Sequence, residues 1–246
     1  MFEVLKNHPF GVVADLERTV VLAFAAPAEE LAALLPSFLE PDTFNERWGF
    51  VAMAAVRTRD LRPSGFPKWC GQDFWLIGYR IFVRYPNAVG KRLRGLYILG
   101  SETDRRLMAV LGNRFTHYGY RYKPMTAALG PHGISLRAKD GSTAVVVKDD
   151  GAAVALPSDS VFADWIEARR FVGPLPFTFS HNVRKDHVLI VEGSRTNWHP
   201  RPVSVVEHRC DFITNLRLSE LRLSNAFTID RVPYHWKPGI LESLER

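Results

Sequence analysis

The stretch Gly112-Asn113-Arg114-Phe115-Thr116-His117-Tyr118-Gly119-Tyr120-Arg121 gathers two arginines, a histidine and two tyrosines between glycines. The sequence before it predicts a short helix from Arg105 to Leu111. Ser101-Glu102-Thr103-Asp104 has the pattern of a capping box, and Gly112 is a natural C-terminal stop. The polar groups of this stretch are therefore expected at the junction between a helix and a strand.

This stretch resembles the active-site segment of the acetoacetate decarboxylases, Gly-Arg-Glu-Leu-Ser-Ala-Tyr-Pro-Lys-Lys. Gly112 and Tyr118 match the glycine and tyrosine of that segment, Phe115 takes its apolar position, and Thr116 stands for serine. The two lysines of the family fall on Tyr120 and Arg121. The resemblance implies a Schiff-base enzyme, in which a lysine amine with a lowered pKa attacks a ketone. Tyrosine cannot form an imine and arginine is too basic, so the frame is expected without its nucleophile.

The rest of the chain carries a second resemblance. The segments 162–177 and 232–236, which read Phe-Ala-Asp-Trp-Ile-Glu-Ala-Arg-Arg-Phe-Val-Gly-Pro-Leu-Pro-Phe and Val-Pro-Tyr-His-Trp, are similar to the YqjF-like family of bacterial proteins. That family is usually placed in the acetoacetate decarboxylase-like superfamily. The strand, helix and strand expected over 18–56, with a Leu-Leu-Pro break after the helix, resemble the opening of the same superfamily. The resemblance implies one α+β domain over residues 1–246, mainly antiparallel β, built as a cone or barrel with a few short helices.

Hydrophobic patterning and turn residues predict the individual elements. Apolar, aromatic and β-branched runs favour strands, and the run 73–85 contains Gly78, where an interruption is expected. The Asp140-Gly141 pair predicts a tight hairpin. Strands are expected at 19–24, 48–56, 73–85, 93–99, 133–138, 143–148, 177–182, 187–192, 203–212 and 226–232, and helices at 28–35, 105–111 and 162–170.

Composition restricts the classes of function. The chain has 246 residues, a formal net charge of +6 and 46% hydrophobic residues. It contains no apolar run of the roughly 20 residues that cross a bilayer and no signal peptide, so a cytoplasmic protein without a membrane partner is expected. The arginines are scattered along the chain, which disfavours a nucleic-acid partner. Cys70 and Cys210 fit neither a zinc nor a disulfide pattern and are expected as free thiols.

The candidate site residues suggest recognition of an anion. Arg114 and Arg121 are expected to bind a carboxylate in two-pronged geometry, and Tyr118 to orient a carbonyl group. Tyr120 and His117 are candidates for proton transfer. The neighbouring strand residues Tyr79 and Arg80 are expected to line the same cavity. The alternative is structural: tyrosines that pack on a sheet and arginines that pair with Glu102 or Asp104.

Two lysines are candidates to replace the missing nucleophile. Lys123 lies close to the matched stretch, but in a regular strand it shares a face with Arg121 and points away from Tyr120 unless a bulge intervenes. Lys68 would have to reach the pocket from a separate loop. No His-Glu-x-x-His motif or His/Cys cluster is present, so neither a metal nor a cofactor is expected.

Two hypotheses of different classes follow from these observations. The first is an enzyme that acts on a small oxo acid without a lysine imine. The second is a non-catalytic protein that binds a small anionic molecule on the same fold. By analogy with the superfamily, a homo-oligomer is expected.

Overall fold

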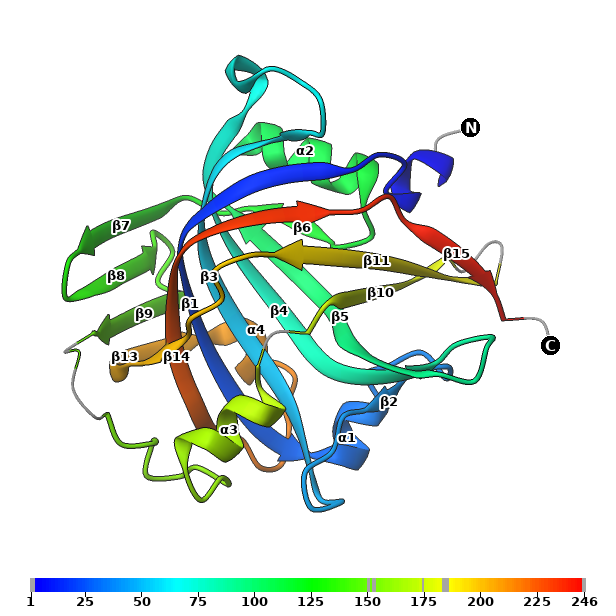
Figure 1. Ribbon diagram of the computed structural model, residues 1–246. Helices are drawn as coiled ribbons and strands as arrows, with labels where there is room; N and C mark the ends of the chain where they lie inside the picture. Colours follow the sequence, from blue (N-terminus) through cyan, green and yellow to red (C-terminus); the bar gives the residue numbers. More distant parts are fainter. Residues whose placement is uncertain (1–2, 150, 152–153, 174, 183–185, 245–246) are drawn as a thin grey trace.

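The computed structural model of the protein describes residues 3–149, 151, 154–173, 175–182 and 186–244. Long, strongly bent strands dominate it and wrap around a common axis (Figure 1). The four longest are β1 (Val12–Pro27), β3 (Trp48–Pro63), β4 (Gln72–Pro86) and β14 (Arg222–Trp236). The main sheet, which we call the cone, is mainly antiparallel and agrees with the fold class expected from the sequence.

The order of the strands brings the two ends of the cone together. Its path is β12-β14-β1-β3-β4-β5-β10-β11-β15, and β11 also pairs with β14 over three residue pairs, from Gly193 with Trp236 to Arg195 with Tyr234. The cone is thus joined at one end, where β14 finishes. The remaining strands of this sheet are β2 (Glu40–Pro41), β5 (Arg92–Thr103), β6 (Tyr120–Tyr122), β10 (Phe177–Asn182), β11 (His187–Arg195), β12 (Arg201–Pro202) and β15 (Ile240–Ser243).

The central strands are buried on both faces. In β1 the eight residues from Thr19 to Ala26 are all buried, which explains why this part of the sequence is a continuous apolar run rather than an alternating one. Side chains alternate between the inside and the outside of the cone. Two hydrophobic cores result, one on each face.

A second sheet covers the outer face of the cone. It has the order β13-β9-β8-β7 and consists of β7 (Met125–Gly130), β8 (Gly133–Ala138), β9 (Thr143–Lys148) and β13 (Ser204–Cys210). Its apolar residues, among them Leu136 and Val145, share a core with Leu22 and Ile77 of the cone. Strands β8 and β9 and the hairpin between them have the bounds that the sequence predicted.

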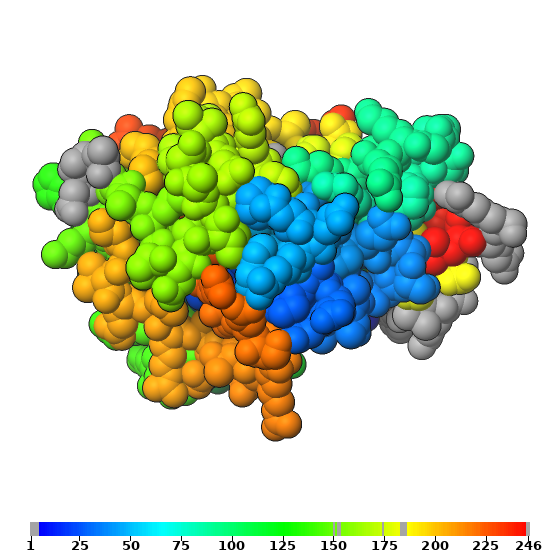
Figure 2. All heavy atoms as spheres, turned by 90° about the horizontal axis from the view of Figure 1, so that it is seen from below, coloured from blue at the N-terminus to red at the C-terminus, as the bar shows by residue number. Residues whose placement is uncertain are grey.

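Short helices close the ends of the cone. They are η1 (Glu3–Asn7), η2 (Lys68–Cys70), α1 (Ala28–Ala32), α2 (Arg106–Phe115), α3 (Trp165–Phe171) and α4 (Asp211–Thr214). The segment with α3 forms a cover beside the blue N-terminal residues when the molecule is seen from below (Figure 2). Phe162 precedes α3 and stacks on Phe50 with a ring distance of 5.1 Å. None of the described helices is long and apolar enough to cross a membrane.

The structure corrects the expected start and end of the helix before the matched stretch. Ser101 to Thr103 belong to β5, and Asp104 accepts a hydrogen bond from the Trp75 backbone instead of capping the helix. The helix then runs through Gly112 to Phe115. Gly112 lies inside the helix instead of ending it, and the glycine is needed there because a Cβ atom would clash with the Tyr120 ring. Strand β4 runs continuously through Gly78, where an interruption was expected, but its pairing with β5 shifts register just beyond, between Tyr79 and Arg80.

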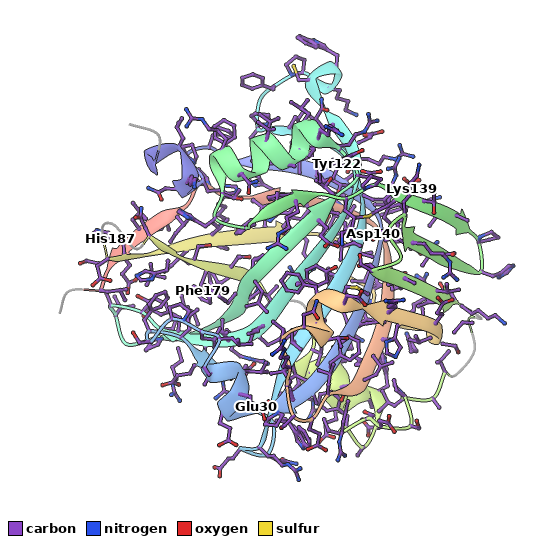
Figure 3. All side chains as sticks on the ribbon, turned by 180° about the vertical axis from the view of Figure 1, so that it is seen from behind. Glu30, Tyr122, Lys139, Asp140, Phe179 and His187 are labelled. Carbon is purple, nitrogen blue, oxygen red and sulfur yellow. The ribbon has the colours of Figure 1, made fainter. Side chains whose placement is uncertain are left out.

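A cluster of polar groups links the cone to the second sheet. The Tyr79 hydroxyl donates to Glu102 Oε2 at 2.8 Å, and Lys123 Nζ lies 2.8 Å from Glu102 Oε1. Lys123 also donates to Ser142 at 2.6 Å and lies 3.5 Å from Asp140. Figure 3 shows Asp140 at the end of the second sheet that meets the cone. Because Glu102 is almost fully buried, it depends on Lys123 to balance its charge.

Replacing Lys123 by Met is expected to lower the free energy of unfolding by about 2–3 kcal/mol, less than the about 3–5 kcal/mol of a fully buried pair. The loss arises because Glu102 keeps its charge without a cation. Urea denaturation measures it, with the exposed neighbour Lys139→Met as a control that changes stability by no more than about 0.5 kcal/mol. The double variant with Glu102→Gln should recover part of the loss; equal effects of both lysine variants would contradict this role.

Candidate functional site

The inside of the cone contains a cavity of about 340 Å³. Along β4 it is lined by Leu76, Gly78, Arg80 and Phe82, which point inward because they are two residues apart. Residues from β1, β3, β5, α2, β6, β11 and β14 complete the wall. A cavity enclosed by a sheet in this way is the natural position for a small-molecule site.

Small side chains on the inner face leave this space open. Ala54 is the cross-strand neighbour of Gly78, and Ala52 is the neighbour of Arg80. Ala23 on β1 is in turn the cross-strand neighbour of Ala52. Cross-strand neighbours on one face lie about 5 Å apart, so two alanines next to Arg80 leave room for its long side chain.

Arg80 is the central charged group of the cavity. Its Nη2 atom lies 3.7 Å from the point where a Cβ atom of Gly78 would stand. Burial lowers the pKa of Arg80 to about 10. Tyr234 raises this pKa, and the nearby positive charge of Arg195 lowers it further. The described residues that line the cavity include no aspartate, glutamate or lysine. At neutral pH the guanidinium is therefore charged, partly buried and without a counter-ion among the described lining residues.

Arg195 is the second guanidinium near this position and is held by the protein. It donates to the Leu175 carbonyl at 3.4 Å and to the Tyr234 hydroxyl at 3.3 Å. Its guanidinium also lies 4.5 Å from the centre of the Trp198 ring. Both arginines face the same space, so the field there favours an anion.

Tyr118 and Tyr120 supply hydroxyl groups to the cavity. Burial raises the pKa of Tyr118 well above its usual range, Tyr120 and Tyr234 raise it further, and Thr178 lowers it. Burial also raises the pKa of Tyr120 to about 12. Both phenols are neutral at physiological pH, so they are suited to donate hydrogen bonds and not to act as bases.

Besides His8 Nδ1 and the Thr19 hydroxyl, three buried donor groups on the cavity wall have no hydrogen-bond partner among the described residues. They are Arg80 Nε, the Tyr118 hydroxyl and Trp198 Nε1. Thr178 lies close to Tyr118, but the two hydroxyls do not form a hydrogen bond of ordinary geometry. Buried donors are normally paired, so these three call for a ligand or water that is rich in acceptor atoms.

The structure separates the residues that the sequence grouped together. Arg80, Tyr118 and Tyr120 line the cavity, whereas Tyr79, Arg114, His117 and Arg121 are not among its lining residues. Tyr79 is the neighbour of Arg80 on β4 and faces the second sheet, where its ring stacks on Phe212 at 4.0 Å. Arg121 is exposed. The inward alternation of β6 selects Tyr120 and turns Arg121 outward.

The two candidate lysines also lie outside this cavity. Lys123 is engaged with Glu102 on the other side of β5. Lys68 lines a second, more open depression together with Ser194 and His235. Cys70, which follows Lys68 in η2, does line the cavity, and both cysteines are free thiols.

Sequence reasoning missed four residues of the site: His8, Arg195, Trp198 and Tyr234. Tyr234 was noticed only as part of a family resemblance, and Arg195 had no local motif. His8 adopts a positive φ of 53°, and burial lowers its pKa, so its imidazole is neutral at pH 7. No group of three or more His, Cys, Asp or Glu side chains gathers as a metal site in the described parts of the chain.

Comparison with known proteins identifies both a sequence family and a fold. The family DUF2071, described as an uncharacterized conserved protein, matches residues 13–237. No curated protein matches the chain in sequence. Among solved structures, acetoacetate decarboxylase from Legionella pneumophila is similar with a TM-score of 0.61 and 14% identity, over 96% of this chain and 88% of that chain.

Two further structures share this architecture. An acetoacetate decarboxylase-like enzyme from Sphingomonas wittichii RW1 has a TM-score of 0.58 and 12% identity, over 98% of this chain and 94% of its own. The enduracididine biosynthesis enzyme MppR, in complex with pyruvate, has a TM-score of 0.55 and 10% identity, over 95% and 90%. The chain thus has the fold of the acetoacetate decarboxylases, as the matched stretch predicted.

Replacing Arg80 by Met is expected to stabilise the ligand-free protein. In the unfolded chain the pKa of Arg80 returns to its ordinary, higher value, so the charge inside the cone opposes folding at every pH below about 10. Each kcal/mol gained in the free energy of unfolding raises the melting temperature by about 2–4 °C. Calorimetry of dialysed protein measures this rise. The control is Arg84→Met on the same strand, which should destabilise because Arg84 pairs with the buried Asp42. A similar fall in melting temperature in both variants would contradict the conclusion that Arg80 has no counter-ion.

Proposed function

Since the chain belongs to the DUF2071 family of uncharacterized conserved proteins, we propose that it binds a small oxo acid or similar carboxylate in the cone cavity, without a lysine imine. One observation carries this proposal. Arg80 presents a partly buried guanidinium to a cavity whose described wall contains no carboxylate. A ligand carboxylate would supply the missing counter-ion in charge-assisted, two-pronged geometry.

The unpaired donors support the same class of ligand. A carboxylate is a pure acceptor with two oxygens, and an oxo acid adds a carbonyl oxygen. Arg80 and the Tyr118 hydroxyl would bind these oxygens, and Arg195 would strengthen the field. The pyruvate complex of MppR is an example of an oxo acid bound by a protein of this fold, which we extend to this chain as a proposal.

Catalysis on the bound ligand is the second candidate function. It is favoured by Tyr118 and Tyr120, whose raised pKa keeps them as neutral donors that polarise a carbonyl. His8, with a lowered pKa, would be the base on the same wall. Exchange of ligand protons for deuterium, or release of carbon dioxide, would distinguish this function from binding alone.

Arg80→Met is expected to weaken carboxylate binding by about 10- to 150-fold, corresponding to the about 1.5–3 kcal/mol of a hydrogen bond to a charged group. Isothermal titration with a panel of 2-oxo and 3-oxo acids measures this. Arg121→Met is the matched control, since Arg121 is exposed and lies outside the cavity wall. The proposal fails if Arg121→Met weakens binding while Arg80→Met does not.

Borohydride reduction in the presence of the same acids is expected to give no covalent adduct, because no described lysine lines the cavity. Intact-mass analysis provides the readout, and a Schiff-base acetoacetate decarboxylase is the positive control. An adduct that maps to Lys68 or Lys123 would refute the imine-free proposal and would assign that lysine as the nucleophile.

A further inference from the structure

The cavity is much larger than a short oxo acid requires. Its volume of about 340 Å³ corresponds to roughly eleven water molecules at about 30 Å³ each. Pyruvate has six non-hydrogen atoms and would leave roughly half of this volume empty on the same scale. Cavities of this size bind larger organic molecules, so the rest of the wall contains information about the ligand.

The polar groups of the wall are concentrated around one position. Arg195 lowers the pKa of Arg80 and Tyr234 raises it, so both lie near its guanidinium. Tyr234 also raises the pKa of Tyr118. Arg195 in turn contacts Trp198 and Tyr234. These five side chains therefore form a single polar pole within the cavity.

The wall leading away from this pole towards α2 is mainly apolar. Leu76 lies one inward step beyond Gly78 on β4, with Val56 as its cross-strand neighbour. Helix α2 contributes Met108, Leu111 and Phe115, and Phe115 packs edge-on against Phe10 at 5.2 Å. Polar groups placed among these side chains would lose their hydration without gaining partners.

The lining also extends far along the strand. It runs on β4 from Gln72 to Phe82, eleven residues or roughly 33 Å of extended backbone. Three guanidiniums line this space, but Arg195 and Arg62 already bind protein acceptors: Arg195 the Leu175 carbonyl and the Tyr234 hydroxyl, Arg62 Asp60 and the Phe66 carbonyl. An elongated space in which Arg80 alone lacks a protein acceptor suits an extended molecule with a single charged end. A second carboxylate on the ligand would therefore have no unengaged guanidinium among the described lining residues.

We propose that the ligand is a monocarboxylate with an extended apolar body, roughly ten to twelve non-hydrogen atoms in all, with its carboxylate at Arg80 and its body along the wall towards α2. The inference rests on the carboxylate-binding function proposed above and specifies its ligand class. Burial of each added methylene should strengthen binding about fourfold, the equivalent of about 0.8 kcal/mol.

The test is a homologous series of saturated monocarboxylates from acetate to dodecanoate, titrated by calorimetry together with pyruvate. We expect the dissociation constant to fall about fourfold per methylene and to level off when the cavity is full. Methyl esters and dicarboxylates of equal length should bind at least tenfold more weakly. Affinity that is independent of chain length, or pyruvate as the tightest ligand, would overturn the ligand class and leave the carboxylate site intact. Failure of every carboxylate to bind would overturn both proposals.

A pair of variants on α2 locates the apolar body. Met108 is buried and lines the cavity, whereas Leu107 next to it is 52% exposed. Met108→Trp should shorten the chain length at which affinity levels off. Leu107→Trp should leave the whole series unchanged. If Met108→Trp does not fold by circular dichroism, Met108→Phe serves in its place. An unchanged series in the folded Met108 variant would overturn the placement towards α2.

Discussion

Strand β4 has to serve two buried faces at once, and the rest of the molecule is arranged around this constraint. Its outward side chain Tyr79 donates to Glu102 and thereby joins the second sheet to the cone. Its next residue, Arg80, points inward, and two alanines on the neighbouring strand β3 leave space for it and for the cavity. Because successive side chains cannot share a face, structural and binding groups alternate along one strand. The outside of β4 is filled and the inside is left hollow.

The sequence carried enough information for the fold and for part of the site. Continuous apolar runs and turn residues located the strands, and two of the tyrosines in the matched stretch, Tyr118 and Tyr120, line the cavity. The alternation rule would also have separated Tyr79 from Arg80 had it been applied there. Arg195 and Tyr234 were beyond reach, since only the pairing of β11 with β14 brings them together. The role of Gly112 was hidden for a similar reason, because it depends on a ring eight residues later.

Inside the cone, the unpaired charge that favours ligand binding lowers the stability of the ligand-free protein. Elsewhere the chain pairs its buried charges: Asp42 is held between Arg84 and Arg94, and Glu102 contacts Lys123. Arg80 is the exception within the cavity wall. Binding sites commonly retain groups that disfavour folding, because the free energy of the unmatched charge is recovered when the ligand arrives. Tyr118 and Tyr120, which remain neutral, add directional hydrogen bonds in the same cavity without adding a second charge.

The pairing of β1 with β14 has a consequence for how the chain reaches its native state. Val12 pairs with Trp236, so one edge of the first long strand has no partner until nearly all of the chain has been synthesised. At about 5–20 residues per second this interval is roughly 10 to 45 s. An apolar strand with an open edge is prone to associate with other chains during that time. Such non-local pairing favours slow folding, and the hollow cone therefore depends on protection of its first strand while the last one is being made.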